Sequence, residues 1–245
     1  MRTLFIADAH LVSPDKANYR QLLMFLHEQE GCLDSLYIMG DLFDFWLGFP
    51  SNPFRHYDPL VEALERLVAR GCSLVYYEGN HDFHLGPLFS HRLKARIERG
   101  AAIERLQGRQ LYLCHGDQIN RGDYLYRLLR FFLHSSLTAV CVSHVPPTWA
   151  ERIRGRLQKH SQSTYETKTV RWDYRQILHD FAGTLTETGC DGVVTGHFHL
   201  ALQEKVPGTS IELVALGDWM GQQTYAEMID GVLSLKSYAA AAPIS

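Results

Sequence analysis

Long apolar runs are missing from this 245-residue chain, although 46% of its residues are hydrophobic. It holds no stretch of about 18 apolar residues, the length that a membrane-spanning helix needs, so we expect nothing to cross a membrane. Asp8 and His10 interrupt the first apolar run too early for a secretory signal peptide. The expected place of action is the cytoplasm or its membrane face.

Cysteine is also scarce, with five residues that lie far apart in the sequence. Their number is odd and their spacing matches neither a zinc motif nor a redox pair, so we expect buried thiols in a reducing compartment. An excess of one charge is lacking too. The net charge is −3, which gives no general case for nucleic-acid binding. No feature indicates an obligate protein partner.

What the chain does have is a set of polar side chains that follow five short apolar runs, over residues 4–7, 36–39, 74–77, 111–114 and 193–195. Ligands of an α/β sheet bind at the carboxyl ends of its strands. We therefore expect seven metal-ligand candidates at one sheet edge: Asp8, His10, Asp41, Asn80, His115, His197 and His199. Strand alternation would place His197 and His199 on one face, and likewise Asp8 and His10 if the first strand continues through them.

Helical patterns separate these runs, which indicates a single α/β domain over residues 1–245 with one insertion. The patterns predict helices over residues 17–30, 58–70, 87–99 and 168–187. Asp58 is the expected N-cap of the second helix, and Gly71 is expected to end it. Two closing strands are expected over residues 211–216 and 232–236.

The donor set has imidazole and oxygen atoms without thiolate, which suits ions such as Mn²⁺, Fe²⁺, Co²⁺ or Zn²⁺. Seven donors are too many for one tetrahedral ion with an open position, and they suit two ions that share a bridging carboxylate. Two ions about 3.5–4 Å apart polarise a phosphoryl group and activate a water molecule. The sequence thus predicts hydrolysis of a phosphate ester or anhydride by in-line attack of metal-bound water.

In order along the chain, these elements resemble the DxH, GD, GNH[DE], H and GHxH pattern of the calcineurin-like metallophosphoesterases. The resemblance implies an α/β sandwich of two mixed β-sheets flanked by helices. It implies two metal sites that share Asp41, one completed by Asp8, His10 and His199, and the other by Asn80, His115 and His197. The expected catalytic residues are Asn80, His81 and Asp82. His81 would be an acid near the leaving oxygen, and Asp82 would orient it through a hydrogen bond.

About eighty residues separate His115 from His197, far more than a connecting loop needs. Residues 121–175 carry ten Lys or Arg and four Asp or Glu, a net +6, which leaves −9 for the rest of the chain. Two interpretations stay open. Composition favours a helical hairpin that packs on the sheet with a solvated basic face. The alternative is a surface for an acylated phosphate or an anionic membrane.

Further segments are similar to the UDP-2,3-diacylglucosamine pyrophosphatases of lipid A biosynthesis, over residues 40–48, 79–83, 115–117 and 216–219. The resemblance implies that residues 119–165 form a helical cap that holds acyl chains, and that the metal is Mn²⁺. UDP-2,3-diacylglucosamine would then be cleaved to UMP and 2,3-diacylglucosamine 1-phosphate (lipid X) by a peripheral protein on the inner face of the cell membrane. The substrate contacts expected on this basis are Asn80, Asp123, Tyr126, Arg156, Ser161, Lys168 and His197.

One position departs from that subfamily, because its well-known members carry Arg where this chain has His81. The polar run over residues 159–164 is altered as well. The alternative function is therefore a metallophosphoesterase that acts on another phosphomonoester or phosphodiester, such as a nucleotide or a phosphoprotein. A third is a metal-binding scaffold that has lost catalysis, but none of the expected donors is missing.

Overall fold

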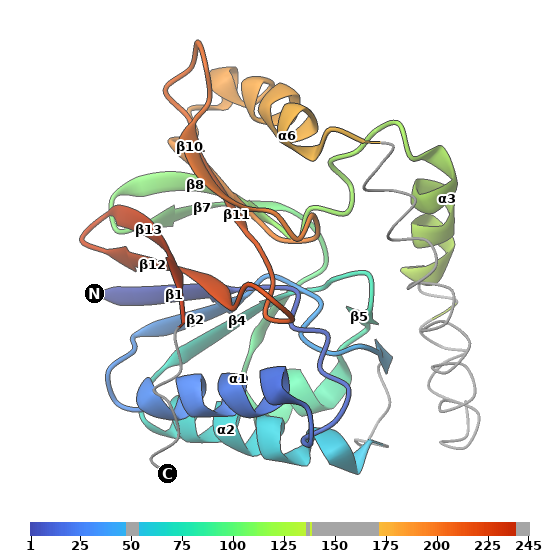
Figure 1. The fold of residues 1–245 in the computed structure, drawn as a ribbon, viewed down its shortest axis with the longest axis vertical. Coiled ribbons are helices and arrows are strands. Elements are labelled where there is room, and N and C mark those ends of the chain that lie inside the picture. Colours follow the sequence, from blue (N-terminus) through green and yellow to red (C-terminus); the bar gives the residue numbers. More distant parts are fainter. Residues whose placement is uncertain (48–53, 136–137, 139–171, 239–245) are drawn as a thin grey trace.

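A computed structural model describes residues 1–47, 54–135, 138 and 172–238 of the chain. Two β-sheets pack face to face, and helices cover the outer face of each (Figure 1). The predicted α/β sandwich of two mixed sheets is confirmed. A separate small sheet pairs β3 (Trp46–Leu47) with β5 (Asp82–Phe83) in parallel.

The first sheet has six strands, and its central part is parallel. Its order is β13 (Val232–Ser237), β12 (Thr224–Ile229), β1 (Arg2–Ile6), β2 (Ser35–Ile38), β4 (Ser73–Tyr77) and β6 (Arg96–Glu98). The register pairs Leu4 with Leu36 and Leu36 with Leu74. Because β1, β2 and β4 run in the same direction, the loops that follow them leave from one edge of the sheet.

The second sheet has five strands, with an antiparallel strand on each side of a parallel centre. Its order is β10 (Ala201–Lys205), β11 (Glu212–Leu216), β9 (Gly192–Thr195), β8 (Arg109–Cys114) and β7 (Ala102–Leu106). The register of β8 and β9 pairs Cys114 with Thr195. The loops after these two strands therefore start side by side.

Alternation along β1 divides its side chains between two cores. Leu4 and Ile6 pack in the core beneath α1 (Ala17–Glu28) and α2 (Asp58–Ala69), whereas Phe5 packs between the two sheets. On the far side of the second sheet, α6 (Tyr174–Gly183) buries Leu178 completely. The molecule is thus layered helix, sheet, sheet, helix, as Figure 1 shows.

The predicted helices over residues 17–30 and 58–70 are confirmed as α1 and α2, with small differences at their ends. Tyr57, not Asp58, is the N-cap of α2, because a 3₁₀ turn (Arg55–Tyr57) leads directly into the helix. Gly71 follows the last turn with a φ of +95°, the left-handed conformation that commonly ends a helix.

The helix predicted over residues 87–99 is confirmed only in its first part. Residues 86–92 are helical, with a π-type turn over Leu88–Arg92, whereas Arg96–Glu98 forms strand β6. The edge of β4 offers backbone hydrogen bonds that a helix here would leave unmade, and Glu78 N–H donates to the Glu98 carbonyl at 2.8 Å. Pairing with the sheet decides the conformation, as it commonly does for short segments of mixed pattern.

Helix α3 (Tyr124–Leu133) lies within residues 119–165, the predicted cap. Residues 136–137 and 139–165 lie outside the described residues, so the extent of the cap stays a prediction. The helix predicted over residues 168–187 corresponds to α6, which begins after the N-cap Asp173, and a 3₁₀ turn (Thr186–Thr188) follows it. Within the described residues, no helix has the length and apolar character needed to cross a membrane.

Candidate metal centre

The seven predicted ligands meet where the loops after β1, β2, β4, β8 and β9 converge. The first sheet delivers Asp8, His10, Asp41 and Asn80, and the second delivers His115, His197 and His199. Contacts between their polar atoms link all seven, as the next paragraphs describe. The centre is therefore built across the seam between the two sheets.

The paired ligands sit on loops, so the expectation that strand alternation aligns them is wrong. Asp8, His10, His197 and His199 have φ values of 53°, 42°, 71° and 51°, and Asp41 has 54°. This left-handed conformation is uncommon for residues other than glycine, and it clusters at functional sites. The tight loops turn each side chain toward the centre instead of leaving it on a sheet face.

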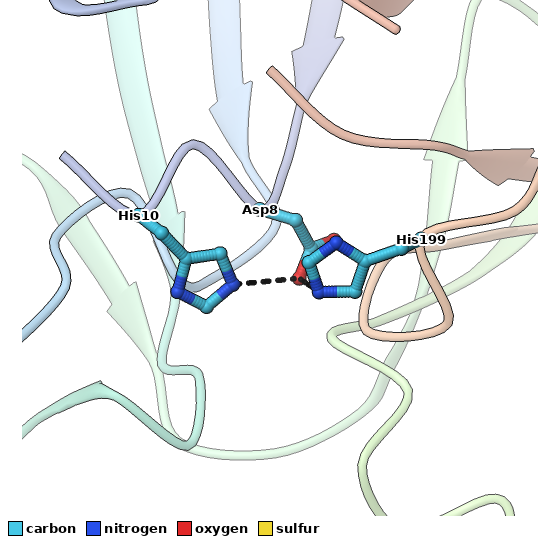
Figure 2. Close-up of side chains that lie close together, drawn as sticks. All are labelled: Asp8, His10 and His199. Carbon is cyan, nitrogen blue, oxygen red and sulfur yellow. Dashed lines mark ion pairs between the residues drawn. The ribbon is translucent and has the colours of Figure 1, made fainter. Parts of the chain in front are cut away.

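One group consists of Asp8, His10 and His199, whose ligand atoms all lie within 4.8 Å of one another. Figure 2 shows the Asp8 carboxylate between the two imidazole rings. Asp8 Oδ1 is 3.9 Å from His10 Nε2 and 3.8 Å from His199 Nε2. These distances are too long for hydrogen bonds, and they leave room for an ion among the three side chains.

A second group consists of Asp8, Asp41 and His115. Asp41 Oδ2 lies 3.7 Å from His10 Nε2 and 3.5 Å from His115 Nε2, so this oxygen faces both groups. The amide oxygen of Asn80 extends the second group, because it lies 3.1 Å from His115 Nε2 and 2.9 Å from His197 Nδ1. Asp41 thus stands where a shared carboxylate would stand.

The residues fit a divalent ion by two further observations. Asp8 Oδ1 and His10 Nε2 are buried and have no hydrogen-bond partner among the described residues. Buried polar atoms are almost always satisfied, and exceptions commonly mark an absent ion or water. The carboxylate and imidazole donors are also the types that borderline divalent ions prefer.

The charges of the cluster are arranged around Asp41. Burial acts to raise its pKa, but the neighbouring His115 and His81 outweigh that effect and hold the pKa well below its usual value. For His115, burial acts to lower the pKa and Asp41 raises it, with a net rise to about 10. Burial and the charge of His115 lower the pKa of His197 to about 3. Asp41 therefore offers a negatively charged oxygen at the middle of the cluster, where a cation could bind.

Two glycines make the close approach of the loops possible. A Cβ atom on Gly79 would lie 2.1 Å from Asp41 Oδ1, and one on Gly40 would lie 2.4 Å from His115 Nδ1. Gly40 also has a φ of +88°. Any larger residue at these positions would displace a candidate ligand.

The prediction that Asp82 orients His81 through a hydrogen bond is wrong. The buried Asp82 carboxylate accepts hydrogen bonds from the Tyr76 hydroxyl and from four backbone N–H groups, those of Asp41, Leu42, Phe43 and Gly79. It therefore shapes the loop that carries Asp41. The ring of His81 is oriented instead by the Asp44 carbonyl, 2.9 Å from its Nδ1 atom.

Sequence reasoning missed two carboxylates beside the centre. Asp44 forms a third group with His10 and His81 whose ligand atoms lie within 4.8 Å. Asp218 Oδ2 lies 3.5 Å from His199 Nδ1, the arrangement by which carboxylates commonly orient a metal-binding imidazole. Both belong to segments noted for their similarity to known proteins, so the motifs pointed to these residues without revealing their roles.

Comparison with known proteins agrees with this geometry. The sequence model described as calcineurin-like phosphoesterase matches residues 1–201. The chain belongs to the calcineurin-like phosphoesterase family. Among solved structures, an archaeal phosphodiesterase superimposes on this phosphoesterase with a TM-score of 0.50, covering 96% of this chain and 99% of that one. The sequence identity is 13%, so this likeness shows the fold alone.

Curated relatives of this phosphoesterase carry the name UDP-2,3-diacylglucosamine hydrolase. The protein from Xanthomonas campestris pv. campestris is 30% identical over an alignment of 252 positions, which covers 98% of this chain and all of that one. The protein from Pseudomonas paraeruginosa is 29% identical over 234 residues, covering 94% and 95%. The protein from Nitrosococcus oceani is 30% identical over 226 residues, covering 89% and 88%.

The predicted substrate contacts of this phosphoesterase are only partly within the described residues. Asp123 is the N-cap of α3 and accepts a hydrogen bond from Tyr126 N–H at 3.2 Å. The Tyr126 hydroxyl donates to Asp117, and the ring centroid of Tyr126 lies 6.1 Å from that of His197. Tyr126 is thus near the metal centre, and Asp123 caps the helix that carries it. Arg156, Ser161 and Lys168 lie outside the described residues.

Proposed function

We propose that this phosphoesterase hydrolyses the pyrophosphate bond of UDP-2,3-diacylglucosamine, releasing UMP and 2,3-diacylglucosamine 1-phosphate. The observation that carries the proposal is the similarity of about 30% to proteins named UDP-2,3-diacylglucosamine hydrolase over nearly the whole of both chains. A match of that extent includes the loops that bear the candidate ligands as well as the segment that contains α3.

We assign two divalent ions, Mn²⁺ by preference, to the two groups of side chains. Asp8, His10, Asp41 and His199 would hold one ion. Asp41, Asn80, His115 and His197 would hold the other, and the position of Asp41 Oδ2 between His10 and His115 supports its role as the bridge. When bound, such a pair supplies Lewis-acid polarisation of the phosphoryl group and activation of water.

His81 is proposed to protonate or stabilise the leaving oxygen. The Asp44 carbonyl can only accept a hydrogen bond, so His81 Nδ1 carries the hydrogen and Nε2 remains for the substrate. The ring of His81 lies against that of His10, with centroids 4.7 Å apart. The side chain is therefore held beside the metal centre without depending on Asp82.

The acyl chains are proposed to contact α3, which exposes a stripe of large apolar side chains. Tyr124, Leu128, Phe131 and Phe132 are between 56% and 74% exposed. Their spacing places them on one side of the helix, and we call them the apolar face of α3. An exposed apolar stripe of this kind suits lipid tails and a membrane surface. We therefore propose that the enzyme acts at the membrane surface as a peripheral protein.

The sugar phosphate would be held by the cap and the loops near it. Asn80, Tyr126 and His197 are proposed contacts because they lie at or beside the metal centre, and Asp123 because it caps the helix that carries Tyr126. Arg156, Ser161 and Lys168 are proposed from their chemistry alone, because cations and hydroxyls bind phosphate oxygens.

The direct test is hydrolysis of UDP-2,3-diacylglucosamine in detergent, followed by ³¹P spectroscopy with Mn²⁺ or with EDTA. UMP is expected only with the metal. UDP-N-acetylglucosamine, which lacks the two acyl chains, is the matched substrate control and should be cleaved much more slowly. Metal-dependent cleavage of an aryl phosphodiester without cleavage of the lipid would contradict the proposed substrate and favour a soluble one.

A further inference from the structure

Asp117 is buried in the loop that carries His115, and two residues of α3 donate hydrogen bonds to it. The residue is 4% exposed and lies two positions after His115. Its Oδ2 atom accepts a hydrogen bond from the Tyr126 hydroxyl at 2.8 Å and another from Arg130 Nε. With the oxygen and nitrogen of its side-chain amide exchanged, Gln118 accepts two hydrogen bonds from the Arg130 guanidinium, at 2.9 and 3.1 Å. We call Asp117, Tyr126 and Arg130 the clamp.

The other end of α3 is fastened to the loop that follows β4. His84 Nε2 lies 2.9 Å from the Leu133 carbonyl, which ends the helix. His134 stacks on Phe83 with ring centroids 4.6 Å apart, and its Nδ1 lies 3.7 Å from Glu78 Oε2. Glu78 and Phe83 stand on either side of the segment that carries Asn80 and His81. Both ends of α3 are therefore attached to loops that bear candidate ligands.

The clamp is enclosed, unlike an ordinary surface ion pair. The side chains of Arg130 and Asp117 are 13% and 3% exposed, respectively. Removing one partner of a buried ion pair leaves an unpaired buried charge and is strongly destabilising, whereas an exposed pair contributes little. Arg127, one turn before the clamp residue Arg130, is exposed and makes no comparable ion pair within the described part of the chain.

We infer that Arg130 is a positioning residue for the lipid part of the substrate. Through Asp117 it fixes α3 against the loop of His115, and so sets the distance between the apolar face of α3 and the phosphate that is cleaved. This inference rests on the proposed function. A substrate that spans the metal centre and α3 needs that distance, whereas a small phosphodiester that touches only the metal centre does not.

The test compares Arg130→Met with Arg130→Lys, which keeps the charge, and with Arg127→Met as the matched control on the same helix. For UDP-2,3-diacylglucosamine in mixed micelles, Arg130→Met should raise KM about tenfold with little change in kcat, the mark of lost binding that is equal in the ground state and the transition state. Arg130→Lys should recover part of the loss, and Arg127→Met should match wild type. Bound metal and the rate on bis(p-nitrophenyl) phosphate should stay within about twofold.

Hydrogen exchange supplies a readout that does not depend on the substrate. The backbone amides of residues 128–133 should exchange faster in Arg130→Met than in wild type or Arg127→Met. If Arg130→Met does not fold, the double variant Asp117→Asn/Arg130→Met removes both buried charges and serves in its place.

The possible outcomes separate the two proposals. Wild-type protein that leaves UDP-2,3-diacylglucosamine intact would overturn the proposed function. If wild type cleaves the lipid, an unchanged KM in the variant, or an equal loss on the lipid and on the small diester, would overturn the role assigned to Arg130.

Discussion

At the scale of single residues, the centre depends on one carboxylate that serves two groups. Asp41 faces His10 and His115 through Oδ2, while its Oδ1 accepts a hydrogen bond from His81 N–H at 2.8 Å. Its neighbours hold the Asp41 pKa well below the usual range, so the carboxylate is charged at any physiological pH. A charged oxygen that faces both groups of donors is what two cations at short distance require.

Removal of that carboxylate should therefore abolish both metal binding and catalysis. In Asp41→Ala we expect bound metal to fall from about two ions per chain to one or none, with activity below detection. Metal analysis after gel filtration measures the first, and UMP release measures the second. Near-normal turnover in this variant would contradict a dinuclear centre.

His81 should behave differently, because it is assigned to the leaving group and not to the metal. His81→Ala is expected to slow turnover by about 10²- to 10⁴-fold at unchanged metal content, the range for a lost general acid. The exposed His27 provides a control, and His27→Ala should match wild type. Loss of metal from His81→Ala would show that His81 is a ligand.

At the scale of elements, the loop after β4 must pass very close to the loop after β2. Gly79→Ala would place a methyl group 2.1 Å from Asp41 Oδ1 and 2.5 Å from Asp41 N. We expect about 1–3 kcal/mol of destabilisation from the overlap, together with weaker metal binding. Gly100→Ala is the control, because nothing lies within 4 Å of the added carbon. Equal melting temperatures for the two variants would contradict the close approach.

Strands that are marked by an apolar run in the sequence could be predicted. Strands that form only because they pair with a neighbouring strand could not. The apolar runs before Asp8, Asp41 and Asn80 are strands, because each is buried on both faces and is recognisable without its neighbours. Strand β7, by contrast, alternates between half-buried residues such as Glu104 and exposed residues such as Arg105. That pattern does not indicate a strand by itself, and the segment becomes a strand because it pairs with β8.

The residues of the candidate site could be predicted from the sequence, but the loop conformations and hydrogen bonds that position them could not. The seven ligand candidates follow from the ends of five strands. The left-handed loops that aim them, and the five hydrogen bonds that Asp82 accepts, depend on contacts between segments up to forty-one residues apart. Chain spacing carries no information about such contacts.

At the scale of the whole molecule, the metal centre joins the two sheets. The first sheet supplies Asp8 and Asp41, the second supplies His115 and His199, and backbone His197 N–H donates to Asp8 Oδ2 at 2.7 Å across the seam. Ligands from both sheets have the right geometry only in the folded chain. Metal binding should therefore be linked to global stability.

Metal removal should lower the melting temperature of the whole molecule. At a metal concentration of a thousand times Kd, binding to the native state adds about 4 kcal/mol per independent site. Calorimetry with EDTA and then with added Mn²⁺ should show a reversible rise of several degrees, and Asp41→Ala should not respond. An equal melting temperature with and without metal would mean that the ion does not bridge the sheets.

The most direct test of a metal-dependent pyrophosphatase is hydrolysis of UDP-2,3-diacylglucosamine in H₂¹⁸O, with mass analysis of both products. With Mn²⁺ we predict UMP that carries one ¹⁸O atom and an unlabelled diacylglucosamine 1-phosphate, because water attacks the phosphorus next to uridine. With EDTA neither product should form. An intact substrate, products without metal, or label on the lipid phosphate would contradict the proposed reaction.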